Sequence, residues 1–236
     1  MMDLFNSNYC YFTILAIACS YPLLQSFEKR IQFYKSWIYL LPAIFVMMSI
    51  HIPLDIIFTN IGVWRFNNEL IYGILVFNLP IEEWLFFVII PFSSLFIYKV
   101  LKYFFKIPPP LILHYKFALF AAIILFFLAI LFFPRIYTSC YFIISGFSLL
   151  LVFYVKPKWW NNFLLMYFVS LMPFILINGL LTGSFTDQAV VIYNESHIIG
   201  FRVFNIPIED FVYSFEILLT VIWTFEYFKS SQKSYS

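Results

Sequence analysis

Seven long apolar stretches constrain the fold of this chain more than any other feature of its sequence. Each has about the 20 residues that an α-helix needs to cross a lipid bilayer. Only 11% of the residues are charged, well below the roughly 25% of a typical globular domain. The sequence therefore predicts an all-α integral membrane protein with seven transmembrane helices. They are expected near residues 8–27, 37–57, 79–100, 111–133, 136–155, 160–181 and 206–228.

A nine-residue segment occurs twice, at the start of the third and of the seventh apolar stretch. Residues 76–84 read VFNLPIEEW, and residues 203–211 read VFNIPIEDF. Six of the nine positions are identical, at a constant offset of 127 residues from Pro80 to Pro207. The same offset relates Gly73 to Gly200 and Asn67 to Asn194. A constant offset over this length predicts an internal duplication.

The basic residues predict the orientation in the membrane. Alternate loops and the C-terminus hold eleven of the fourteen lysines and arginines, whereas the other loops hold only Arg65, Arg135 and Arg202. Because cytoplasmic loops carry an excess of Lys and Arg, the N-terminus is expected outside and the C-terminus in the cytoplasm. Both repeated segments then lie at the non-cytoplasmic ends of their helices.

The duplication and the orientation together predict a 3+1+3 architecture. A first three-helix repeat would occupy residues 1–105, a linker span residues 106–135, and a second repeat residues 136–236. The two repeats would run in parallel, related by an axis along the membrane normal. The outer segments 58–78 and 182–205 are too polar to span, so we expect them to fold over the mouth of the bundle.

Each repeated segment places two adjacent acids just after its proline: Glu82 and Glu83 in the first copy, Glu209 and Asp210 in the second. One interpretation is structural, with Asn78 as a helix cap and the carboxylates near the positive end of the helix dipole.

The chemical interpretation of the paired acids rests on helix geometry. Adjacent helical residues point about 100° apart, so one acid can face the interior while its neighbour turns toward the loops. A carboxyl group in an aromatic interior is a candidate general acid, and aromatic faces stabilise a passing carbocation. This arrangement suits proton donation to an alkene followed by proton removal.

The doubled Pro-x-Glu-Glu/Asp motif ahead of aromatic residues resembles the membrane lycopene cyclase family, which occurs as paired small subunits or as one fused chain. The segments that lead into the motifs, from Asp55 to Asn67 and from Asn178 to Gly183, resemble the family too. The resemblance implies a lycopene beta-cyclase that closes the linear ends of lycopene into β-ionone rings with no net redox change. It further implies no cofactor, a bacterial cell membrane and association with other carotenoid-pathway enzymes.

The resemblance and the pairing of the acids predict a set of site residues. Glu82 and Glu209 are expected to be the principal acid/base pair, with Glu83 and Asp210 tuning or returning the proton. Trp84, Phe87, Phe211 and Tyr213 are expected to line the substrate site. Supporting roles are expected for Asp55, Arg65, Asn78, Arg202, Asn205 and Glu216.

Two of these supporting roles have open alternatives. Glu216 lies two turns after Glu209 and serves either catalysis or a hydrogen bond to another helix. Arg65 and Arg202 either pair with motif acids or meet lipid headgroups.

Rival functions remain open from the sequence. A small 3+1+3 transporter would use the paired acids for proton coupling, although few polar groups lie at mid-membrane depth. A cyclase acting on a longer C50 carotenoid is another alternative, and the sequence does not set the ring isomer or whether both ends react. The three cysteines lack zinc-site spacing, so no metal is expected.

Overall fold

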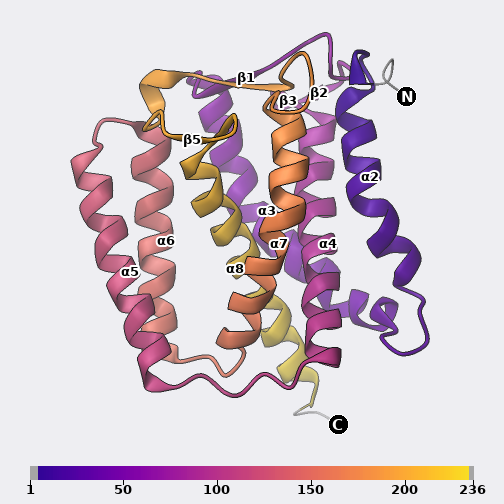
Figure 1. The fold of residues 1–236 in the computed structure, drawn as a ribbon, viewed down its shortest axis with the longest axis vertical. Coiled ribbons are helices and arrows are strands. Elements are labelled where there is room, and N and C mark those ends of the chain that lie inside the picture. The colour runs from indigo at the N-terminus through magenta and orange to yellow at the C-terminus, as the bar shows by residue number, and fades with distance from the viewer. Residues whose placement is uncertain (1–4, 234–236) are drawn as a thin grey trace.

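A computed structural model describes residues 5–233, and within them seven α-helices form a bundle (Figure 1). Six of these helices are long and apolar enough to cross a membrane. The protein is therefore an all-α membrane protein, as predicted. The helices are α2 (Cys10–Gln25), α3 (Trp37–Asn60), α4 (Ile81–Phe104), α5 (Ile112–Leu131), α6 (Ile136–Val155), α7 (Trp160–Leu181) and α8 (Ile208–Lys233).

Helix α2 is shorter than the predicted first span of residues 8–27. It has 16 residues and stays apolar throughout. The chain turns directly after it, where Ser26 N donates to Leu23 O and Gln32 adopts a left-handed φ of 47°. A short 3-10 helix, η1 (Phe33–Ser36), then leads into α3.

Short strands gather at one end of the bundle, where α4 and α8 begin (Figure 1). Strand β1 pairs antiparallel with β4, and two hairpins, β2–β3 and β5–β6, lead directly into α4 and α8. The predicted outer segments thus join each other across this end. The strands are β1 (Trp64–Phe66), β2 (Leu75–Val76), β3 (Leu79–Pro80), β4 (Val191–Tyr193), β5 (Arg202–Val203) and β6 (Ile206–Pro207), with the 3-10 helix η2 (Glu195–His197) after β4.

The β1–β4 ribbon is symmetric under the sequence offset of 127 residues. Arg65 lies opposite Ile192, its own equivalent. Asn67 N donates to Val190 O, and Asn194 N donates to Val63 O, both over 2.8 Å. Exchanging the two copies turns each of these bonds into the other, so a local pseudo-two-fold axis passes through the ribbon.

The two hairpins repeat the same backbone geometry. Gly73 and Gly200 have φ values of 94° and 87°, a region that glycine enters without a Cβ penalty. Ile81 N donates to Ile74 O over 2.9 Å, and the equivalent bond in the second copy, from Ile208 N to Phe201 O, measures 3.0 Å. The duplicated sequence therefore gives a duplicated entry into each motif helix.

The prediction that Asn78 caps the motif helix is wrong. Asn78 lies in the turn between β2 and β3 with a φ of 66°, and Pro80 is the residue that precedes the helix. The hairpin carries the chain into the helix in an extended conformation, and the Asn78 side chain donates to Asn60 Oδ1 over 2.9 Å instead.

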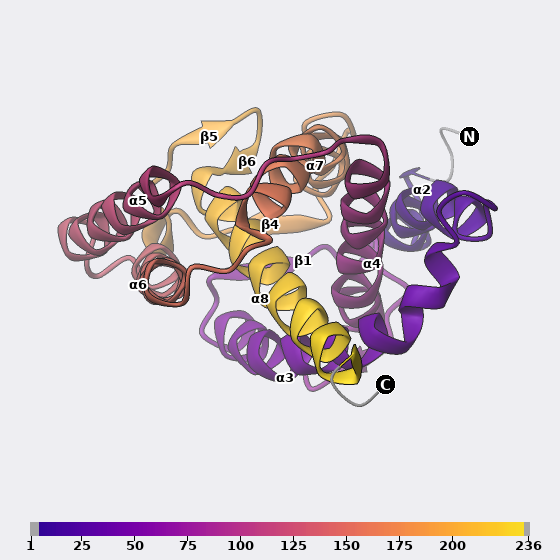
Figure 2. The same cartoon turned by 90° about the horizontal axis from the view of Figure 1, so that it is seen from below.

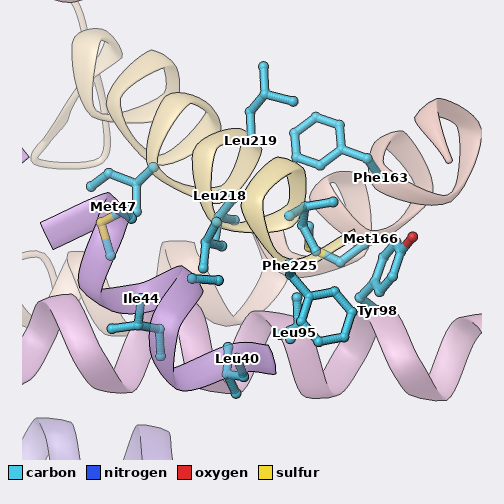
Figure 3. Packing of buried hydrophobic residues seen from close by; sticks show 14 of the residues in the cluster. Leu40, Ile44, Met47, Leu95, Tyr98, Phe163, Met166, Leu218, Leu219 and Phe225 are labelled. Atoms are coloured by element: carbon cyan, nitrogen blue, oxygen red, sulfur yellow. The ribbon is translucent and has the colours of Figure 1, made fainter. Parts of the chain in front are cut away.

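Each motif helix packs against one helix of its own copy and one helix of the other copy. Helix α4 packs against α2 and α7, whereas α8 packs against α6 and α3, as the view along the bundle shows (Figure 2). Helix α5 packs on α6 at the outside. The core joins α3, α4, α7 and α8 through interlocking apolar side chains (Figure 3). They include Leu40, Ile44, Met47, Leu95, Tyr98, Phe163, Met166, Leu218, Leu219 and Phe225.

Candidate functional site

One cavity lies beside the first turns of α4 and α8. We call it the acid cavity. Each motif helix contributes five residues spaced i, i+3, i+4, i+7 and i+8, which is one face of a helix. On α4 they are Glu83, Phe86, Phe87, Ile90 and Pro91, and on α8 they are Asp210, Tyr213, Ser214, Ile217 and Leu218. Every α8 residue is the equivalent of an α4 residue at the offset of 127. The two copies therefore line a single cavity.

The first acids of the two motifs, Glu82 and Glu209, bind the backbone of the segments that lead into the two hairpins. Both are fully buried, and neither is among the residues that line the acid cavity. Glu82 Oε1 accepts from the backbone N–H of Tyr72 over 2.6 Å, and Glu209 Oε1 accepts from that of Ile199 over 2.6 Å. Tyr72 and Ile199 are again equivalents. One acid of each pair does turn toward the loops, and it is the first.

The second acid of the first copy, Glu83, faces the acid cavity together with Asp55 of α3. Glu83 Oε2 accepts from the Tyr11 hydroxyl over 2.6 Å. Asp55 Oδ1 lies 3.5 Å from the Tyr213 hydroxyl, and its Oδ2 is buried without a hydrogen-bond partner. Glu83 has acidic neighbours on both sides, since its carboxyl group interacts electrostatically with Asp55 of α3 and with Asp210 of α8.

The second acid of the second copy, Asp210, is surrounded by hydrogen-bond donors. The hydroxyls of Tyr137 and Tyr193 and the amide of Asn178 donate to it, each with a contact of 2.8 Å. Tyr193 lies in β4, outside the spanning helices. Burial and, after it, the nearby Asp210 carboxylate raise the pKa of Tyr193 well above its usual value, so this phenol stays a donor.

The predicted substrate-lining aromatic residues divide into two groups. Phe87 and Tyr213 line the acid cavity. Trp84 instead donates from Nε1 to Val76 O over 3.3 Å, and the Phe211 ring packs on Phe174. Seven further aromatic residues line the cavity that sequence reasoning did not single out for it: Tyr11, Trp64, Phe66, Phe86, Tyr137, Phe174 and Tyr193.

The predicted supporting residues Glu216, Arg202 and Asn205 lie outside the acid cavity. Glu216 accepts from Ser148 of α6 over 2.7 Å, which is the helix-to-helix hydrogen bond that the sequence left as one alternative. Arg202 forms an ion pair with Glu195. Asn205 donates to Gly183 O over 2.9 Å.

Arg65, another of the outer arginines, is exposed. Among the described side chains, neither Arg65 nor Arg202 forms an ion pair with a motif acid. Residues 5–233 also contain no group of three or more His, Cys, Asp or Glu side chains arranged to hold a metal ion.

The hydroxyls on α2 and α6 are the functional contacts that sequence reasoning missed. Tyr11 donates to Glu83, and Thr138, its equivalent at the offset of 127, donates to Glu209. Both helices had contributed only hydrophobicity to the sequence argument. Aligning the two copies beyond the motifs would have shown a hydroxyl at the same position of each.

Comparison with protein families gives two matched regions, each of which contains one copy of the repeated segment. The model of the family described as lycopene cyclase matches residues 8–101 and 134–228. The chain belongs to the lycopene cyclase family. The two matched regions hold nearly all of α2 to α4 and of α6 to α8, and the gap between them holds α5. Membership supports a carotenoid cyclase role. No curated protein and no solved structure matches the chain.

Proposed function

We propose that the protein cyclises the linear ends of lycopene to β-rings by acid–base catalysis, forming γ-carotene and then β-carotene without a cofactor. The observation that carries this proposal is the acid cavity, where Glu83, Asp55 and Asp210 meet among aromatic side chains. Ionisable groups buried inside a membrane helix bundle are rare and are functional candidates by default. A cyclase needs a proton donor, a proton acceptor and a surface that tolerates positive charge, and all three meet in this one cavity.

Glu83 and Asp55 form the proton donor in this proposal. Both side chains are buried, at 8% and 2% exposure. Two carboxylates in one buried place repel each other, so the pair is expected to retain a proton. Asp55 Oδ2 has no hydrogen-bond partner among the described residues, so a proton on this oxygen is available for transfer to a substrate.

Asp210 is the proton acceptor. Hydrogen bonds to a carboxylate favour its charged form, and Asp210 accepts from Tyr137, Tyr193 and Asn178. The same donors restrain its orientation toward the cavity. This differs from the sequence-based assignment, in which Glu82 and Glu209 were the principal pair, because those two acids bind the loops.

The reaction balances with one proton in and one proton out. The donor pair protonates C2 of a linear end, the C1=C2 electrons form the new C–H bond, and C1 becomes a tertiary cation. The C5=C6 double bond attacks C1, which forms the C1–C6 bond and moves the positive charge to C5. Asp210 then removes the proton from C6, and the electrons of that C–H bond form the C5=C6 bond of the β-ring. Return of the proton from Asp210 to the donor pair completes the cycle.

Aromatic faces stabilise the travelling cation. Phe86, Phe87 and Tyr213 project from the motif helices into the acid cavity, and Trp64 and Tyr137 close it from other elements. A cation held over an aromatic face gains about 0.5–2 kcal/mol, more where water is excluded. The same rings keep water from trapping the cation before the ring closes.

We infer that the bundle follows the 3+1+3 plan, with a first repeat at residues 1–105, a linker at 106–135 and a second repeat at 136–236. The symmetric β1–β4 ribbon and the exchanged packing of α4 and α8 support this plan. Lys102 and Glu226 pair near the ends of α4 and α8, far along each helix from the motif acids. With basic residues on that side in the cytoplasm, the acid cavity lies toward the outer face and the N-terminus is outside.

Expression in a host that accumulates lycopene tests the proposed function. The wild-type chain is expected to convert red lycopene into yellow cyclic products, and Glu83→Gln and Asp210→Asn are expected to leave the pigment linear while inserting into the membrane normally. Unchanged pigment with the wild-type chain would overturn the assignment. Repeating the assay in a host that makes C50 carotenoids separates the two substrate lengths, because the true substrate is converted faster.

A further inference from the structure

A second, larger cavity opens beside the acid cavity between α2, α4 and α7. We call it the lateral groove. The two cavities adjoin each other, since six residues line both of them: Phe86, Ile90, Phe174, Asn178, Ser214 and Leu218. Along α4 the groove runs from Phe86 to Ile97, which spans about 16 Å at 1.5 Å per residue.

The groove presents a hydrocarbon surface. None of its lining residues is charged. Four of its six hydroxyls donate within the protein: Ser93 to Ala18 O over 3.0 Å, Tyr167 to Phe211 O over 2.8 Å, Ser170 to Met166 Sδ over 3.3 Å and Ser214 to Phe211 O over 3.0 Å. A polar ligand would find few free hydrogen-bond partners there, whereas an apolar chain needs none.

The groove opens toward the lipid. Ile17 and Tyr21 of α2 and Leu176 of α7 line it and are 50%, 66% and 54% exposed, on helices that face the bilayer. On the pseudo-symmetric side of the bundle, side chains bridge α3 and α6. His51 lies 3.2 Å from the Tyr141 hydroxyl, and Phe58 packs against Tyr141. The duplicated acids therefore share a cavity that has an open groove on the α2–α7 side.

We propose that the lateral groove binds the extended polyisoprenoid chain of the substrate while one end occupies the acid cavity. This rests on the proposed function. The substrate enters sideways from the lipid between α2 and α7, and one end reacts at a time. A product with two rings then requires the one-ring intermediate to leave and to enter again with its other end first.

A pair of alanines on α2 provides a matched test of groove binding. Ala18 lines the groove, whereas Ala16, two residues earlier, is exposed and does not line it. With wild type active on lycopene in membranes, Ala18→Phe is expected to lower the initial cyclisation rate at least tenfold, and Ala16→Phe to change it less than twofold. Leu176→Trp at the exposed rim repeats the test if Ala18→Phe does not accumulate in the membrane.

The outcomes separate the groove from the function itself. A groove that holds only membrane lipid predicts full activity for Ala18→Phe and Leu176→Trp, and that result overturns this inference while leaving the cyclase assignment intact. An inactive wild type overturns the cyclase assignment. A pulse of labelled lycopene chased with excess unlabelled lycopene tests the order of events: label retained in one-ring product supports release between rings, and label passing entirely into two-ring product refutes it.

Discussion

Asn178 of α7 donates its side-chain amide to Asp210 Oδ2 over 2.8 Å, whereas the other copy of the duplication places the carboxyl group of Asp55 in the cavity beside Glu83. The two halves of the acid cavity thus place different groups beside the second acid of each motif, a carboxyl group in the first copy and a side-chain amide in the second. An amide can only support a charged neighbour by donating to it, while a second carboxyl group competes with its neighbour for charge. In the proposed mechanism, this difference separates the proton-accepting side from the proton-donating side.

The donor role of Asp55 predicts a large loss for Asp55→Asn, which gives the first copy the amide of the second. Cyclisation is expected to slow at least 100-fold, because general acid catalysis typically contributes 10²–10⁴. Initial rates in membranes at matched protein amounts provide the measurement. Glu216→Gln is the control, since it changes a buried acid on α8 outside the cavity and keeps an acceptor for Ser148. Equal rates for Asp55→Asn and wild type would remove Asp55 from the chemistry.

The loop-binding role of the first acids predicts that Glu82→Ala and Glu82→Gln differ in stability. Alanine leaves the Tyr72 N–H without its acceptor, which costs about 1–3 kcal/mol for a buried group. Glutamine keeps an oxygen at that place and is expected to retain most of the stability and to cyclise within tenfold of wild type. Thermal unfolding in detergent and initial rates give both values. A Glu82→Gln protein that is stable but as inactive as Glu83→Gln would return Glu82 to the chemistry.

The sequence predicted the membrane class, the family and the repeated entry into the two motif helices, because hydropathy and a constant offset can be read directly from the residues. It also predicted that the two acids of a motif diverge. It did not predict which acid faces inward, since that depends on the rotation of α4 about its axis. Helix α4 begins directly after Pro80, at the end of an extended hairpin, whereas the sequence had suggested a helix cap at Asn78. The sequence also did not show that the two copies of the motif line the same cavity. Their union in one cavity depends on packing between α3, α4, α7 and α8.

Tyr193 predicts a test that separates chemistry from structure. Tyr193→Phe removes one of the three donor side chains on Asp210 and keeps the ring. The charged carboxylate loses support, so the rate near neutral pH is expected to fall about tenfold, in line with the roughly 1.5–3 kcal/mol of a hydrogen bond to a charged group. The acidic limb of the pH–rate profile should move to higher pH, because a protonated Asp210 does not accept a proton. Tyr227→Phe, at an exposed tyrosine, is the control. A lower rate with an unmoved profile would mean that Tyr193 only shapes the cavity.

Gly73 and Glu82 act on the same turn, because Gly73 follows directly after the residue whose N–H Glu82 binds. At a φ of 94° an added methyl group meets no atom within 4 Å, so Gly73→Ala tests backbone strain alone. Gly73→Ala is expected to lower the free energy of unfolding by about 1–2 kcal/mol. Alanine at this position is expected to move the Tyr72 N–H away from Glu82. Glu82→Ala should then lower the free energy of unfolding less in the Gly73→Ala background than in wild type. A double-mutant cycle by thermal unfolding measures this coupling, expected to exceed about 0.5 kcal/mol for residues that share one turn. Additive losses would show that the glycine and the acid stabilise the hairpin independently.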